Sequence, residues 1–146
     1  MDLAPDFDEF IGSLIAHEVE FLIIGAYALA FHGSPRFTGD LDVFVQPTVA
    51  NGRRLLAAVT AFGFPTIGLR PEDVAAGQKV VEMGLEPVQI HVMSAITGVE
   101  WDEASASRQH GRLGTHAPPV QHLPGITHPR LHGQSQRGPA RQRFAS

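Results

Sequence analysis

The sequence predicts an α/β (α+β) domain, with a small mixed β-sheet and helices packed on one side of it. Apolar runs at residues 20–24, 40–45 and 79–94 have the length and the alternation that β-strands require. Segments 5–19 and 49–62 instead place apolar residues at helical spacing. Glycine and proline lie between these segments, so we expect the helices and strands to be joined by short turns.

The composition is that of one globular domain. The chain has 146 residues, of which 43% are hydrophobic and 18% are charged, and this is enough to form a buried core. The absence of cysteine excludes disulfides and thiolate zinc sites. The first ten residues are acidic, unlike a signal peptide, and no apolar run approaches the roughly 18 residues of a membrane span. We therefore expect a cytoplasmic protein with no membrane partner.

The N-terminal part is expected to form a helix, a strand and a second, shorter helix. Pro5–Val19 has the pattern of an amphipathic helix, with acids in its first turn where the helix dipole favours them. Glu20–Ile24 is expected to be a buried strand. Gly25 then leads into a short helix at Ala26–His32, whose free N-terminal N–H groups have the chemistry to hold a phosphate. The alternative is that the glycine between the strand and the helix serves packing alone and binds no phosphate.

Two aspartates mark the next strand. Asp40 and Asp42 are one residue apart, so their side chains point to the same face, while Leu41, Val43 and Val45 point to the other face and into a core. Neighbouring carboxylates raise each other's pKa unless a positive charge lies between them. A cation such as Mg²⁺ prefers such oxygen ligands and commonly comes with a phosphate. The sequence therefore predicts a Mg²⁺ site at these two residues.

This arrangement resembles the nucleotidyltransferase superfamily, with its DNA polymerase beta-like core. Ile24-Gly25-Ala26 stands for the family pattern hG[GS], with alanine where the family usually has glycine or serine, and Asp40-Leu41-Asp42-Val43 stands for the pattern Dh[DE]h. The 13 intervening residues, Tyr27 to Gly39, are at the long end of what the family uses. The resemblance is closest to the minimal nucleotidyltransferase-like proteins of prokaryotes and covers roughly residues 6–107. Many of these proteins are known as predicted enzymes or as members of toxin–antitoxin pairs.

The resemblance implies roles for particular residues. Asp40 and Asp42 would bind Mg²⁺, and the backbone of Gly25 and Ala26 would contact the phosphates of an NTP. Ala26 lacks the hydroxyl that serine supplies in many family members. Arg36 would assist at the triphosphate, although a solvated arginine in a turn explains it equally well.

The remaining part of the expected domain supplies one more site candidate. Val49–Phe62 is expected to be a helix, Glu72–Ala76 a helical turn, and residues 79–94 two strands. In the family, a strand after the aspartates carries a third carboxylate, and His91 stands at that position here. A neutral imidazole would bind a metal or accept a proton, with an ordinary pKa near ~6.5. The alternative is a histidine that only packs between strands.

The last part of the chain has a different composition. We expect a nucleotidyltransferase-like domain at residues 1–108 and a basic, Pro/His/Arg-rich tail at 109–146. All fifteen acids precede residue 104, and the six arginines after it have no acidic neighbours. Such a segment is typical of disorder, and it lacks the interleaved aromatics that would favour a nucleic-acid partner. It also resembles a high-GC gene translated out of frame, so we hypothesise a frameshifted C-terminus.

Two functions follow as expectations. The first is transfer of a nucleoside monophosphate from an NTP to an unknown acceptor, with Mg²⁺ as the metal ion and a protein as one candidate acceptor. The alternative is an antitoxin-like binding protein of a toxin–antitoxin pair, which keeps the fold with weak or no catalysis. His91, Ala26 and the unusual tail favour this alternative.

Overall fold

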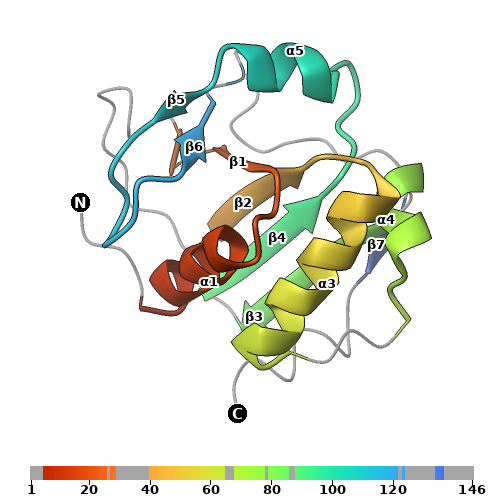
Figure 1. Ribbon diagram of the computed structural model, residues 1–146, viewed down its shortest axis with the longest axis horizontal. Coiled ribbons are helices and arrows are strands. Elements are labelled where there is room, and N and C mark those ends of the chain that lie inside the picture. The colour runs from red at the N-terminus through yellow and green to blue at the C-terminus, as the bar shows by residue number, and fades with distance from the viewer. Residues whose placement is uncertain are drawn as a thin grey trace.

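The computed structural model describes residues 5–25, 27–28, 40–64, 68–77, 79–85, 88–121, 123 and 134–136. The helices are α1 (Pro5–Ala16), α3 (Val49–Phe62), α4 (Pro71–Ala76) and α5 (Trp101–Ala106). The strands are β1 (Phe21–Ile24), β2 (Asp40–Val45), β3 (Lys79–Leu85), β4 (Val88–Met93), β5 (Gln109–His110), β6 (Pro119–Val120) and β7 (Gln134–Gln136). These strands form one mixed sheet in the order β5-β6-β1-β2-β4-β3-β7, with α1 and α3 side by side across it (Figure 1).

The centre of the sheet combines antiparallel and parallel pairing. β1 is antiparallel to β2, β2 is parallel to β4, and β4 is antiparallel to β3. In this register Asp42 lies opposite Ile24 on one side and His91 on the other. The strand that ends at the glycine and the strand that carries the histidine therefore both flank the aspartate strand. The expected α+β fold with a small mixed sheet is confirmed.

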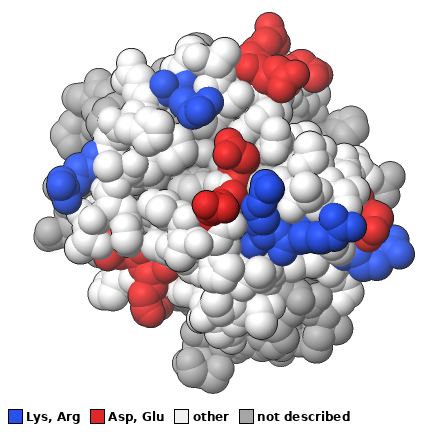
Figure 2. Space-filling view, in the orientation of Figure 1, with Lys and Arg blue, Asp and Glu red and all other residues white. Residues whose placement is uncertain are grey.

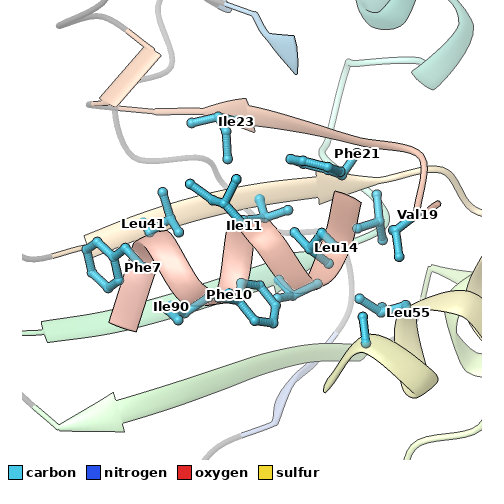
Figure 3. Packing of buried hydrophobic residues seen from close by; sticks show 14 of the residues in the cluster. Phe7, Phe10, Ile11, Leu14, Val19, Phe21, Ile23, Leu41, Leu55 and Ile90 are labelled. Atoms are coloured by element: carbon cyan, nitrogen blue, oxygen red, sulfur yellow. The ribbon is translucent and has the colours of Figure 1, made fainter. Parts of the chain in front are cut away.

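Helix α1 supplies much of the core. Its apolar residues Phe7, Phe10, Ile11 and Leu14 recur at helical spacing and are almost fully buried. Figure 3 shows them against the sheet, where residues such as Ile23, Leu41 and Ile90 point toward the helix. Because β-strand side chains alternate, this face of β2 takes Leu41, Val43 and Val45 and leaves both aspartates on the opposite face.

The start of α3 is fixed by a buried asparagine. Thr48 caps the helix by accepting a hydrogen bond from the backbone N–H of Asn51 at 3.1 Å. The Asn51 side chain accepts from the N–H of Glu20 at 2.8 Å and donates to the carbonyls of Glu20 and Gln46, both at 3.0 Å. It thereby joins α3 to the beginning of β1 and the end of β2, and helps to fix the register of these strands.

A second cluster covers part of the opposite face. Phe44 and Trp101 pack edge to face with ring centroids 5.2 Å apart, and Leu22, Ile24 and Met93 surround them. The expected helical layer of α1 and α3 thus lies on one side, and the short helix α5 packs on the other side at one end of the sheet. The aspartates are on this second face, beyond the apolar cluster.

Residues after the expected boundary at 108 take part in the fold. β6 pairs with β1 through Ile23 and Val120, and Leu113 and Val120 are buried in the core. Thr115 donates hydrogen bonds from its backbone N–H (2.8 Å) and its hydroxyl (2.7 Å) to the carboxylate of Asp8 in α1. The sheet therefore extends past the expected boundary, because strands of two or three residues add to its edges. A frameshifted origin of the C-terminal segment stays a prediction.

The surface is mixed in charge. Figure 2 shows basic side chains gathered in a stripe at the right of the view, with acidic side chains beside it and further basic groups apart from it at the left. None of the helices in the described ranges is long and apolar enough to cross a membrane.

Candidate functional site

The two aspartates of β2 lie at the start of the strand and differ in depth. Asp42 is only 3% exposed, whereas Asp40 is partly exposed. They occupy alternate positions of one strand and therefore share the face opposite α1. The site thus has one buried carboxylate and one carboxylate within reach of solvent.

Gly25 lies directly against Asp42. It follows β1 with a φ of 73°, in the left-handed region that favours glycine. A β-carbon at this position would overlap Oδ2 of Asp42 and lie 3.2 Å from its Cγ. Glycine is therefore needed both for its backbone conformation and for the close approach of the carboxylate. The glycine turn and the aspartate, which the family pattern places together, are in contact.

His91 lies beside Asp42 on the neighbouring strand β4. Its Nδ1 is 3.2 Å from Oδ1 of Asp42, and its Nε2 is 3.1 Å from Oε1 of Gln89. Both ring nitrogens face oxygen atoms that accept hydrogen bonds. The doubly protonated imidazolium, in which both nitrogens donate, satisfies the two contacts together. A buried carboxylate such as Asp42 requires a partner of this kind.

The electrostatic surroundings favour the charged form of His91. Burial alone would lower the pKa of His91, but the hydrogen bond to Asp42 and the negative charges of Asp42, Asp40 and Glu82 together raise it above its ordinary value. We expected a neutral imidazole that could bind a metal or accept a proton. The acidic residues on β2 and β3 that surround His91 shift its pKa upward, toward the charged form, and its role as a metal ligand or base stays a prediction.

Two residues near the site were not among the sequence candidates. Glu82 of β3 lies opposite His91 and is 6% exposed, and Gln89 lies opposite Asp40. Alternation along β3 and β4 places both on the face of the aspartates. The signal that could have identified them is the antiparallel pairing of β3 with β4, since a register with Leu85 opposite Val88 also sets Glu82 opposite His91.

The phosphate-binding candidates are only partly described. Ala26 and Arg36 lie outside the described residues, so their phosphate contacts stay predictions. Tyr27 packs edge-on against Phe7 with ring centroids 5.9 Å apart. Burial, and next the negative charge of Asp40, raise the pKa of Tyr27 above its ordinary value. Tyr27 is thus close to both the core and Asp40.

The carboxylate oxygens of Asp40 and Asp42 suit a hard cation that also binds oxygen atoms of a ligand. Mg²⁺ in proteins is commonly held by one or two carboxylates together with substrate phosphates and water. Within the described ranges, no group of three or more acids, histidines or cysteines is placed to hold a metal ion. Asp40 and Asp42 therefore fit a Mg²⁺ ion that comes with phosphate oxygens, and they do not form a complete cage.

Comparison with known proteins adds a likeness in fold. No family model and no curated protein sequence matches this chain. Among solved structures, the chain is similar to TM1012 from Thermotoga maritima, a proposed nucleotidyltransferase. The TM-score is 0.58 over 80% of this chain and 75% of that chain, with 13% sequence identity. Together with the glycine turn beside the aspartate strand, this likeness shows that the chain has a nucleotidyltransferase-like fold.

Proposed function

We propose that this protein transfers a nucleoside monophosphate from an NTP to an acceptor in a Mg²⁺-dependent reaction. The observation that carries the proposal is the contact between the Gly25 turn and the buried Asp42 carboxylate, with Asp40 on the same face. Gly25 leads into the backbone N–H groups that we propose for phosphate, and it lies against a carboxylate that we propose for Mg²⁺. The likeness in fold to the Thermotoga protein supports the same general class.

Each residue has a role in this proposal. Asp40 and Asp42 would hold Mg²⁺, which when bound neutralises charge on the triphosphate. The backbone at Gly25 and Ala26 would orient the phosphates, and Arg36 would contact them. In the reaction, the acceptor oxygen forms a bond to the α-phosphorus, the bond from that phosphorus to the bridging oxygen breaks, pyrophosphate leaves and the acceptor proton passes to solvent.

His91 takes a different role from the one expected of a metal ligand or a base. Its Nδ1 already contacts Asp42 and its Nε2 already contacts Gln89, so both ring nitrogens are engaged within the protein. Its contact with Oδ1 of Asp42 instead fixes the orientation of that carboxylate. We assign His91 as a positioning residue for Asp42.

Calorimetric titration of the protein with each NTP and Mg²⁺ tests the proposal. We expect saturable, Mg²⁺-dependent binding by the wild type, and loss of binding in Asp42→Asn, which keeps the side-chain shape but removes the charge. Asp102→Asn is the matched control, because Asp102 is an exposed acid on α5. Equal binding by Asp42→Asn and the wild type would remove the catalytic site. Incubation with labelled NTP and Mg²⁺ then shows whether the nucleotide is transferred to the protein itself or to a partner.

A second candidate function is supported by the His91–Asp42 contact. The imidazole of His91 lies 3.2 Å from Oδ1 of Asp42, and its protonated form would neutralise part of the charge that attracts a metal ion. The alternative is therefore an antitoxin-like binding protein with the same fold. It predicts co-purification with a small helical toxin and no transfer of labelled nucleotide. It also predicts that His91→Asp strengthens Mg²⁺ binding, since the internal cation is replaced by a third carboxylate.

A further inference from the structure

A cavity of about 380 Å³ lies at the other end of strands β2 and β4 from the aspartates. Asp40 begins β2, whereas the cavity is lined by Phe44 and by Pro47, which follows the strand. At ~3.3 Å per strand residue, Asp40 and Pro47 are separated by roughly 20 Å, whereas Phe44 at the near wall is about 7 Å along the strand from Asp42. β2 and β4 are parallel, so their C-terminal ends meet at one edge of the sheet, where ligands commonly bind in α/β proteins.

The walls of this cavity come from three parts of the fold. Phe44 and Trp101 form a buried aromatic pair, and the segment from Ser94 to Val99 encloses another side. At the end of α4, a β-carbon on Gly77 would lie 2.8 Å from Cβ of Ala95. The end of α4 thus packs closely against the segment after β4.

The polar groups of the cavity differ in depth. Ser94 is 5% exposed, and its buried Oγ has no hydrogen-bond partner among the residues that the structure describes. Buried hydroxyl groups are nearly always paired, so an unpaired one at a cavity wall points to a ligand group that would satisfy it after a small rotation of the side chain. Glu100 is exposed and is the single charged residue that lines this cavity among the described residues. An anionic ligand would meet this carboxylate without a basic side chain to balance it.

We propose that this cavity binds a small organic ammonium compound that has an apolar ring or chain and a hydroxyl group. The apolar part lies against Phe44 and Trp101, the ammonium group faces Glu100, and the hydroxyl group pairs with Oγ of Ser94. The size is within the range of small-molecule sites in proteins. This site is separate from the aspartates, and it does not depend on the proposed transfer reaction.

Three probes of similar shape test the proposal. Phenethylamine carries the cation, phenylacetate carries an anion instead, and phenylethanolamine adds a hydroxyl group to the amine. Trp101 is the one tryptophan of the chain, so binding is followed by intrinsic fluorescence. We expect saturable binding of phenethylamine, and binding of phenylacetate that is about twofold to fivefold weaker, as for one exposed charge pair. Phenylethanolamine binds more tightly than phenethylamine.

Single-residue variants test which side chain makes each proposed contact with the ligand. Glu100→Gln should abolish the preference for the amine over phenylacetate. Asp102→Asn, an exposed acid on the same helix that does not line the cavity, should retain it. Ser94→Ala should reduce the affinity for phenylethanolamine to that for phenethylamine. Absence of saturable binding, equal binding of phenylacetate, or equal effects of Glu100→Gln and Asp102→Asn would each overturn the proposal. An unchanged affinity of Ser94→Ala for phenylethanolamine would overturn the hydroxyl assignment.

Discussion

Replacement of Gly25 by alanine tests the contact on which the site is built. The new β-carbon would overlap Oδ2 of Asp42, and the backbone has a φ of 73°. The left-handed conformation costs a non-glycine residue about 1–2 kcal/mol. Displacing the carboxylate weakens its charge-assisted contact with His91, which is worth about 1.5–3 kcal/mol. We therefore expect Gly25→Ala to lower the free energy of unfolding by roughly 3–5 kcal/mol.

Urea denaturation of matched variants separates the two contributions. Gly98 has a φ of 80°, and a β-carbon added there would have no atom within 4 Å, so Gly98→Ala measures the backbone cost alone, about 1–2 kcal/mol. In an Asp42→Ala background the obstructing carboxylate is gone, and Gly25→Ala should then cost no more than Gly98→Ala. The reasoning is refuted if the Gly25→Ala cost is the same in both backgrounds, or if it equals the Gly98→Ala cost in the wild type.

Three further predictions concern pH and the buried polar contacts. Because the folded-state pKa of His91 is raised, its contribution to stability should be complete below about pH 6.5 and be lost as the pH rises through the higher folded-state value. Urea midpoints of the wild type relative to His91→Gln measure this, and a difference that grows with pH contradicts it. The backbone and then the side-chain hydrogen bond from Thr115 hold the pKa of Asp8 below its ordinary value. Thr115→Val should raise that pKa in an NMR titration and cost about 0.5–1.5 kcal/mol near neutral pH, a cost that disappears as the pH falls through the folded-state pKa of Asp8. Asn51→Ala should cost roughly 3 kcal/mol in urea denaturation, since it leaves buried backbone groups of Glu20 and Gln46 unpaired; a loss below about 1 kcal/mol would show that water replaces the side chain.

The regular elements could be predicted from the sequence because each has a local signal. Helix α3 spans Val49–Phe62 as its apolar spacing indicates, and alternation places Asp40 and Asp42 together on one face. The charge state of His91 had no such signal. It depends on Asp42 and Glu82, which reach it through pairing with two different strands. The sequence pattern of one strand does not show which residues of the neighbouring strands lie opposite it.

The C-terminal segment was harder to predict for a related reason. Strands β5 and β6 have two residues each, and their region contributes single buried residues such as Leu113 and Val120. With so few residues, these strands show no alternation of apolar and polar residues that would distinguish them from a loop. The frameshift hypothesis is tested by the nucleotide sequence: it fails if neither alternative frame encodes an amphipathic helical continuation.

The pairing of β1 with β6 has a consequence for how the chain acquires its structure. Ile23 and Val120 are neighbours in the sheet although most of the chain separates them. Closing so large a loop is entropically costly, and contacts of this kind slow folding. During synthesis, the first strand must wait for the segment around Val120 to leave the ribosome before its outer edge is covered. Until then that edge is open to pairing with other chains, so slow translation through the last third of the gene should favour aggregation.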